Sequence, residues 1–435
     1  MTFSLIALVL ALLLQLTGCV MDLDFPSLGS KVDPSIEERR ILVTFTDSSI
    51  GRKVPGNILD RYRLHGGYMS SAWSTRVAVD LAEQYGLKLM AEWPVTVLGV
   101  VCVVYEIPVG HILTDTIETI TQDRRVESVQ IMRTFRVLAN ETSASFGSDP
   151  YFRLQKNLQS MHIEEAHRLA TGRGVRIALV DTGVDDAHPD LRGQIAVSKN
   201  LASSNHGNPT DDVHGTAVAG IVAAQLGNGI GIAGIAPDAK LYALRACWPE
   251  RFGSVAAVCN SFTLAAALNE AVRLGIPIIN LSLTGPDDPL VGRLLRAAVD
   301  RGILVVAADA SGNGPNAGFP ANQPGIIAVR AAQMDRKQQA AANDGITAPG
   351  TDILTTLPHG RYDFVSGSSF AAPHVTGLLA LMRQLKPSLT APEAVEVLHA
   401  SKATSAQAPD SLDRIVDACL ALARLRGVPD CGKPL

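Results

Sequence analysis

Three short motifs hold the residues that could do chemistry, and they occur in the order Asp, His, Ser. Asp181 opens Asp-Thr-Gly after an apolar run, His214 opens His-Gly-Thr, and Ser369 lies in a Gly-rich segment before a helical run. A serine becomes a nucleophile when a neighbouring base takes its proton, and that base needs a carboxylate to hold its tautomer. The three residue types together therefore predict acyl-transfer chemistry.

The position expected for each group supports this chemistry. Ser369 is predicted at a helix N-terminus, where unpaired backbone N–H groups favour developing negative charge. Pro373 is tolerable there because early helical positions lack an intrahelical N–H partner. Asp181 follows the apolar strand predicted at 175–180, and α/β sheets place working groups at such carboxyl ends. Taken alone, the Ser369 segment is equally consistent with a Ser-capped buried helix.

Two alternatives apply to the single motifs. Asp-Thr-Gly is also the signature of aspartic proteases, which need two carboxylates sharing one proton. The sequence holds no second Asp-Thr-Gly or Asp-Ser-Gly, so that interpretation would require a dimer. His214, at the predicted start of a helix preceded by Asp211 and Asp212, would by itself be read as a structural histidine.

Taken together, the motifs around Asp181, His214 and Ser369 resemble the three signatures of the subtilisin-like serine proteases, the subtilases, whose chain order is Asp, His, Ser. The resemblance runs from about 151 to 399. It implies a serine endopeptidase that acts on peptides or proteins without a cofactor for its chemistry. Ser369 would be the nucleophile, His214 general base and then acid, and Asp181 the residue that orients His214. The alternative is a non-catalytic, subtilase-like module that binds peptides.

The same resemblance implies further site residues. Ser282, Leu283 and Thr284 are similar to the family's substrate-binding strand, which pairs with an extended peptide backbone. An amide donor to the oxyanion is expected after the strand at 303–307. Asn313 is favoured for it because an amide is a fixed donor and glycines flank it. A gapless count gives Ser311 instead, and Asp309 would serve only if protonated.

A calcium ion is the one metal that the resemblance implies. The Gly-rich segment containing Asn228, Ile230 and Ile232 is similar to a loop that wraps calcium in several relatives, and Asp190 matches a carboxylate there. Two side chains plus carbonyl groups make a lean oxygen set for calcium. The alternative is a Gly-rich turn without metal.

Hydrophobic patterning predicts a small α+β domain followed by an α/β domain with a parallel sheet. The first has the strand and helix order β-α-β-β-α-β of the ferredoxin-like fold. Its strands are expected at 40–45, 87–92, 98–106 and 126–137, and its helices at 75–85 and 112–121. This domain, 40–138, resembles the family's propeptide, which assists folding and inhibits the enzyme until it is cleaved.

The second domain alternates apolar strands with helices, which predicts a parallel sheet covered on both faces. The expected strands are 175–180, 240–244, 276–281 and 303–307, and the expected helices are 216–225, 255–274, 290–301, 391–399 and 411–426. The predicted segments are a signal peptide at 1–19, a tether at 20–39, the propeptide-like domain, a linker at 139–150, the peptidase domain at 151–400 and a helical tail at 401–435.

The N-terminus predicts export. An apolar run of signal length ends in Leu-Thr-Gly-Cys, which resembles a bacterial lipobox with Cys19 as the lipid-carrying residue, although residues 1–4 lack Lys and Arg. A plain signal peptide or an uncleaved anchor is the alternative. The expected location is the bacterial cell envelope, with a membrane contact through the lipid.

Composition limits the remaining classes. The 435 residues carry a net charge of −4 with no long basic block, which gives no reason to expect nucleic acid as a partner. Export permits disulfides. Pairs close in sequence are favoured, Cys247 with Cys259 and Cys419 with Cys431, which leaves Cys102 buried in its strand.

Overall fold

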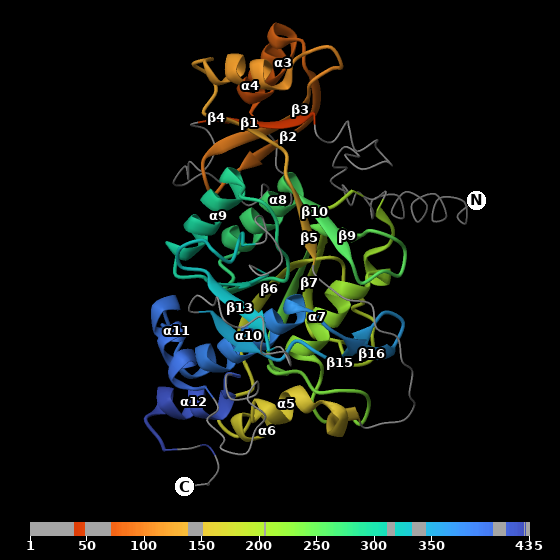
Figure 1. The fold of residues 1–435 in the computed structure, drawn as a ribbon, viewed down its shortest axis with the longest axis vertical. Coiled ribbons are helices and arrows are strands. Elements are labelled where there is room, and N and C mark those ends of the chain that lie inside the picture. The colour runs from red at the N-terminus through yellow and green to blue at the C-terminus, as the bar shows by residue number, and fades with distance from the viewer. Residues whose placement is uncertain are drawn as a thin grey trace, which may run out of the picture.

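A computed structural model describes residues 39–47, 71–137, 151–203, 206–310, 318–332, 345–402, 415–429 and 431. A small domain (red and orange in Figure 1) lies at one end of the molecule, over helices α8 and α9 of a larger α/β domain. The predicted signal and linker, and the predicted tether as far as residue 38, fall outside the described residues. Among the described residues, no helix combines the length and apolar character that crossing a membrane would require.

The small domain has the predicted order of elements. Its antiparallel sheet has the strand order β2-β3-β1-β4, and two helices cover one face. The elements are β1 (Arg40–Thr46), α3 (Ala72–Tyr85), β2 (Lys88–Val95), β3 (Val100–Glu106), α4 (Leu113–Thr121) and β4 (Ser128–Ile131). Helix α3 ends, as predicted, at Gly86, whose φ of 63° is the left-handed conformation that glycine adopts readily.

The single strand predicted at 126–137 is wrong, because the chain changes sheets within it. Met132 still donates its N–H to Arg40 of the small domain, but the carbonyl of Arg133 already accepts from the backbone of Ser261 in the large domain. The second piece, β5 (Thr134–Val137), pairs antiparallel with β10 (Ala257–Asn260) of the large domain. The small domain therefore ends in a strand that belongs to the large domain.

A seven-stranded sheet forms the centre of the large domain, and its pairs are parallel as predicted. The order is β14-β13-β12-β11-β6-β8-β7. The strands are β6 (Arg176–Asp181), β7 (Ile195–Asn200), β8 (Lys240–Arg245), β11 (Ile278–Leu281), β12 (Leu304–Ala308), β13 (Ile327–Ala331) and β14 (Ile346–Ala348). The alternation of β6 shows the two covered faces: Ile177 and Leu179 belong to one hydrophobic core, and Ala178 and Val180 to the other.

Helices cover both faces of the sheet. One core holds residues of α7 (Val213–Ala223), α10 (Ser368–Leu385), α11 (Ala391–Ala400) and α12 (Ala418–Arg426), and the other those of α8 (Ser261–Arg273) and α9 (Pro289–Val299). A hairpin of β15 (Ile353–Leu357) and β16 (Arg361–Val365) packs beside α7, and the short helices α5 (Lys156–Ser160) and α6 (Ile163–Ala166) precede β6.

Two predicted helices are shorter than expected. The helix at 255–274 begins only at Ser261, because Asn260 and Thr263 form a reciprocal capping box there, and the preceding residues are strand β10. The helix at 411–426 begins at Ala418, where Asp417 accepts the N–H of Leu420. Helix α12 packs against α10 and α6, so the last described residues share the core of the large domain.

The predicted cysteine pairing is confirmed. Cys247 and Cys259 are bonded across β9 (Cys247–Pro249) and β10, where they are register partners, and Cys419 is bonded to Cys431. Cys102 is a buried free thiol in β3. The first disulfide fixes the hairpin whose strand β10 pairs with β5.

Candidate active site

The predicted acid and base meet at the carboxyl end of the sheet. Asp181 is the last residue of β6, and His214 lies in the first turn of α7. The Nδ1 atom of His214 lies 2.8 Å from Oδ1 of Asp181, and both side chains are buried. The carboxylate can therefore hold the imidazole in one tautomer, with its Nε2 atom turned away from Asp181.

Close packing of backbone brings the two motifs together. Gly215 donates its N–H to Oγ1 of Thr182 over 2.8 Å, and a Cβ atom at Gly215 would collide with the carbonyl of Gly183. A side chain at this position would push α7 off the turn that follows Asp181. The glycine of His-Gly-Thr is thus required for the close approach of α7 to the turn after Asp181.

Ser369 lies in the first turn of α10, as predicted for a helix N-terminus. The residue is fully buried, and α10 begins after Gly367, whose φ is 147°. The ring of the next residue, Phe370, lies 4.9 Å from the imidazole of His214, centroid to centroid. Within the part of the chain that the structure describes, Nε2 of His214 is buried without a hydrogen-bond partner. The serine motif therefore lies against the imidazole.

The second histidine of the serine motif has a structural role. His374 donates from Nδ1 to the carbonyl of Phe370, and its Nε2 atom accepts from Nδ2 of Asn157 over 2.8 Å. Burial lowers the pKa of His374 to about 4, so this imidazole is neutral. Thr376 also donates to Oδ1 of Asn280 in β11. These bonds fix α10 against the sheet and leave His214 as the histidine available as a base.

A fragment of the chain itself covers one edge of strand β10. Strand β5 pairs with β10 over four residues, with Phe135 opposite Cys259. The buried Phe135 ring lies 5.8 Å from the ring of Phe319, and a Cβ atom at Gly285 would collide with it. Strand β10 can therefore bind an extended peptide and seat a large side chain.

The predicted substrate-binding residues lie beside this edge. Ser282, Leu283 and Thr284 follow β11 and are buried; the hydroxyl of Ser282 accepts from the amide of Asn280, and that of Thr284 donates to the carbonyl of Phe319. Sequence reasoning missed β10, because its residues were included in a helix. The signal that could have found it is Asn260 with Thr263, a capping pair a few residues after the start of that proposed helix.

Comparison with known proteins decides the family. The sequence model described as the Subtilase family matches residues 172–416, which is more than half of the chain. The chain belongs to the subtilase family. The predicted α/β fold is confirmed, and the match supports the predicted class of serine-type endopeptidase, in which an Asp-His-Ser triad is the family's mechanism.

Curated relatives align with about half of this subtilase. M-protease of Shouchella clausii is 36% identical over 51% of this chain and 57% of its own length. Subtilisin Savinase of Lederbergia lenta is 36% identical over 51% of this chain and 81% of its own. The major intracellular serine protease of Bacillus subtilis is 37% identical over 49% and 69%, respectively. The chain thus spans little more than half the length of the first of these relatives.

Solved structures show the same fold. Fervidolysin of Fervidobacterium pennivorans, a keratinolytic enzyme related to subtilisin, matches 92% of this chain and 63% of its own, with a TM-score of 0.67 and 22% identity. A protease of Pseudoalteromonas arctica matches 64% of this chain and 98% of its own, with a TM-score of 0.53 and 26% identity. The first match covers both domains of this subtilase and shows the fold alone.

The oxyanion donor is only partly resolved by the structure. Asn313 and Ser311 lie outside the described residues. Asp309 lies within them, and its Oδ2 atom is 2.6 Å from Nε of Arg330 in β13. A carboxylate in such an ion pair is a charged acceptor and cannot donate to an oxyanion. Asp309 is therefore removed from the three alternatives.

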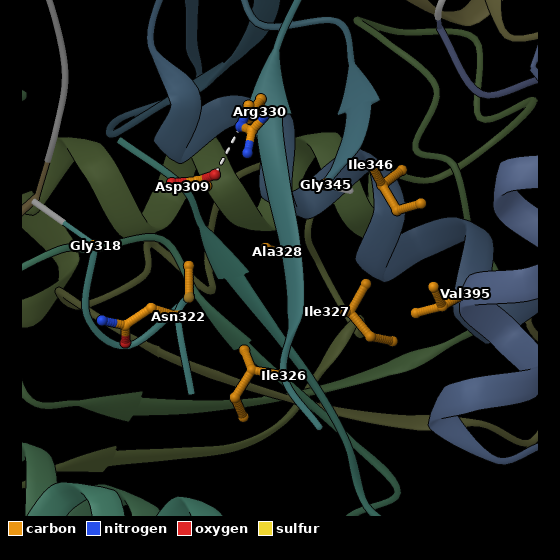
Figure 2. A pocket seen from close by; sticks show the side chains of 11 residues that line it. Asp309, Gly318, Asn322, Ile326, Ile327, Ala328, Arg330, Gly345, Ile346 and Val395 are labelled. Atoms are coloured by element: carbon orange, nitrogen blue, oxygen red, sulfur yellow. Dashed lines mark hydrogen bonds and ion pairs between the residues drawn. The ribbon is translucent and has the colours of Figure 1, made fainter. Parts of the chain in front are cut away.

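A cavity of about 260 Å³ lies along β13, beside this ion pair. Figure 2 shows Asp309 and Arg330 at one end of it and apolar side chains at the other, among them Ile326 and Val395. None of the three predicted catalytic residues lines the cavity. The imidazole of His214 is therefore not part of this cavity.

The predicted calcium ligands lie close together, but hydrogen bonds connect them to one another. Asp190 accepts from the amide of Asn228 over 2.7 Å, from the N–H of Ile232 over 2.8 Å and from the hydroxyl of Tyr362 over 2.9 Å. The N–H of Ile230 donates to Oδ1 of Asn228, the remaining side-chain oxygen. Calcium needs six to eight oxygen ligands. Donors occupy both oxygens of the one carboxylate, so this arrangement does not fit a calcium site.

Within the described ranges, no group of three or more His, Cys, Asp or Glu side chains could hold another metal.

Proposed function

We propose that this subtilase is a serine endopeptidase with Asp181, His214 and Ser369 as its catalytic triad. The observation that carries the proposal is the 2.8 Å contact of Asp181 with His214, on an imidazole that packs against Phe370, the residue after Ser369. A buried carboxylate, a base of fixed tautomer and a serine at a helix N-terminus are the three groups that acyl transfer requires.

The reaction follows from these positions. Nε2 of His214 takes the proton of the Ser369 hydroxyl as its oxygen attacks the peptide carbonyl. Backbone N–H groups at the start of α10 stabilise the oxyanion, together with a side-chain donor for which we propose Asn313. The imidazolium then returns its proton to the leaving amine, and water hydrolyses the acyl-enzyme with His214 again as the base. Asp181 orients His214 and stabilises its charged form throughout.

The test of this function is whether peptide hydrolysis depends on the Ser369 hydroxyl. We expect the wild type to hydrolyse an unfolded protein substrate and Ser369→Ala to lack that activity. Hydrolysis by neither protein, with peptide binding retained, would establish the non-catalytic binding module instead. Undiminished hydrolysis by Ser369→Ala would overturn the assignment.

The substrate class is an extended polypeptide that adds a strand to β10, in the position that β5 occupies. Main-chain pairing with an edge strand gives affinity without strict sequence preference, and pockets for alternate side chains give selectivity. We propose that Ser282, Leu283 and Thr284 also bind this extended peptide. The Phe135 side chain packs against Phe319 and Gly285, so we expect a substrate with a large apolar residue at this position to be preferred.

We extend the proposal to residues 40–138 as a propeptide that inhibits the enzyme. Polar contacts of this domain reach the peptidase domain outside β5 as well. The amide of Gln130 bonds Asp288 and the N–H of Leu290, at the start of α9. The side-chain oxygen of Asn269 in α8 accepts from Val97, and Arg293 pairs with Glu127. Cleavage after β5 would separate this domain from the enzyme.

The anchor of this inhibition is Phe135. In the full chain, Phe135→Ala should shorten the lag before peptidase activity appears, because truncating a buried Phe removes about 3–5 kcal/mol of packing. The lag is measured by continuous hydrolysis of a peptide substrate from the moment of refolding. The matched control is Val109→Ala, at a side chain that is 89% exposed in the same domain. An equal lag in wild type, Phe135→Ala and the control would contradict the inhibitory role of β5.

For localisation we propose an exported lipoprotein, in which the signal segment before Cys19 is removed and Cys19 is acylated as the first residue. Two disulfides support an oxidising compartment. We expect the wild type to fractionate with bacterial membranes and to incorporate labelled palmitate, since a lipoprotein cysteine carries the two or more chains that stable anchoring needs. The variant Cys19→Ala should lose both properties; a variant that stays in the membrane fraction would refute the lipobox.

Calcium stays a prediction from the resemblance, and we do not include it in the proposed function. The contacts around Asp190 fix its loop through hydrogen-bond donors, and no step of the reaction involves this loop.

A further inference from the structure

A buried ion pair, Arg245 with Asp212, lies next to the segments that carry the acid and the base. Arg245 ends β8, in register with Asp181 at the end of β6. Its Nε atom lies 2.7 Å from Oδ2 of Asp212 and its Nη2 atom 3.3 Å from Oδ1, so the contact is bidentate. Both side chains are 2% exposed. Replacing a buried ion pair by apolar groups is often neutral or stabilising, so stability alone is a weak reason to keep this one.

Asp212 connects the segments that carry the acid and the base. It immediately precedes α7, but its side chain makes no capping bond to that helix. Its Oδ2 atom instead accepts the N–H of Gly183 over 2.7 Å, two residues after Asp181. Its carbonyl accepts the hydroxyl of Thr216, in the turn that carries His214. One residue thus bonds the turn after the acid and the helix of the base.

Arg245 sets the orientation of that carboxylate. Its other N–H groups donate to the carbonyls of His206, over 2.9 Å, and Gly207, over 3.2 Å. The guanidinium is thereby fixed from two sides and presents a planar fork to Asp212. Burial raises the pKa of Asp212 and the nearby Asp181 raises it further, whereas Arg245 opposes both effects. Without Arg245, Asp212 would be an uncompensated buried acid beside a second carboxylate.

The surrounding backbone leaves little freedom for an alternative arrangement. A Cβ atom at Gly183 would collide with the backbone of Pro209, and one at Gly215 would collide with the carbonyl of Gly183. The turn after Asp181 and helix α7 touch through their backbones. If Asp212 rotated, its bond to Gly183 would pull that turn out of position relative to α7. Misplacing reacting groups by about 1 Å can cost about 10²-fold in rate.

We propose that Arg245 is a positioning residue of the peptidase reaction, which it supports through Asp212 by holding the Asp181 turn and the His214 helix in register. This inference rests on the proposed function of Asp181, His214 and Ser369. The side chain of Arg245 hydrogen-bonds Asp212 and the segment at 206–207, not strand β10 or the imidazole, so its effect is on the geometry of the acid and base.

The test compares full-length Arg245→Met and Arg245→Lys with the wild type, using kcat per active site titrated with a serine-reactive fluorophosphonate. We expect Arg245→Met to lower kcat by about 10²-fold with KM changed less than about 3-fold, because substrate contacts are untouched. The kcat of Arg245→Lys should be about 10-fold higher than that of Arg245→Met, since lysine keeps the charge but not the bidentate geometry. The control Lys386→Met removes an ion pair with Glu393 at the far end of α10 and should leave kcat unchanged.

If Arg245→Met does not fold, a second variant and a spectroscopic measurement still test the proposal. Asp212→Asn keeps an acceptor for the N–H of Gly183 and should lower kcat by about 10-fold. In one-dimensional proton NMR, the downfield resonance of the His214 Nδ1 proton should shift in Arg245→Lys and Asp212→Asn and stay in place in Lys386→Met. Variants with a lower melting temperature but wild-type kcat per titrated site and an unshifted resonance would overturn the positioning role. A wild type without Ser369-dependent hydrolysis would instead overturn the proposed function, and with it this inference.

Discussion

Peptide hydrolysis is expected to fall by about 10⁶-fold when Ser369 is replaced by alanine, to a rate that still exceeds the uncatalysed one. The reason is that the nucleophile, base and acid work as a unit, while the oxyanion donors and the substrate channel remain. The measurement is kcat on a chromogenic peptide, with circular dichroism to show that the fold is retained. His214→Ala should cause a loss of similar size, and Asp181→Asn one of about 10⁴-fold.

Non-additivity is the sharper part of this prediction. The double variant Ser369→Ala, His214→Ala should be hardly slower than Ser369→Ala, because a base without a nucleophile contributes little. The matched control is Thr210→Ala, at a half-buried position of the short 3-10 helix Pro209–Asp211 before α7, which should keep wild-type kcat. Losses that multiply across the two single variants would contradict a shared triad.

Replacing Asn313 by alanine should lower kcat by about 10²–10³-fold and leave KM nearly unchanged. The amide donates to an oxygen whose negative charge develops only in the transition state, so substrate binding does not depend on it. The control is Ser311→Ala, the position that a gapless count would select. If Ser311→Ala is slow and Asn313→Ala is not, the donor is Ser311. If neither variant is slow, the oxyanion is stabilised by backbone N–H groups alone.

Periodicity predicted most of the scaffold because the strands of this protein follow simple rules. Strands such as β6 and β11 are buried on both faces and appear as continuous apolar runs, which mark a parallel sheet. Gly86 and Gly367 adopt backbone angles that end or precede helices, so local residue types marked those boundaries. The order of the small domain followed from the same local signals.

Long-range pairing was harder to predict. The residues of β10 read as the start of a helix, and they are a strand because a disulfide to β9 and the pairing with β5 hold them extended. The break between β4 and β5 arises where Met132 and Arg133 change hydrogen-bond partners between domains. The disulfide spans only 12 residues, but strand β5 lies more than a hundred residues before β10, so a sequence window does not show that pairing.

In the candidate site, too, local motifs were predictable from the sequence and long-range contacts were not. Motifs predicted Asp181 and His214, and the structure adds the distance between them. Asp212 lies at the N-cap position of α7, but its side chain bonds Gly183 and Arg245 instead of the helix. Carboxylates at such positions have capping as their local option, and only the neighbouring strand β8 supplies the stronger partner. Likewise, the calcium ligands matched a pattern, but Tyr362 on a distant hairpin provides a donor that the pattern did not include.

Strand β5 has a kinetic consequence because it is covalently part of the chain whose β10 edge it covers. Tethering turns its binding into an intramolecular event, whose effective concentration is set by the connection and not by the amount of protein in solution. A free peptide must compete with that local concentration while the connection is intact. Once the connection is cut, the same strand becomes a bimolecular competitor, and dilution alone weakens it. The onset of activity should therefore depend on protein concentration after cleavage but not before it.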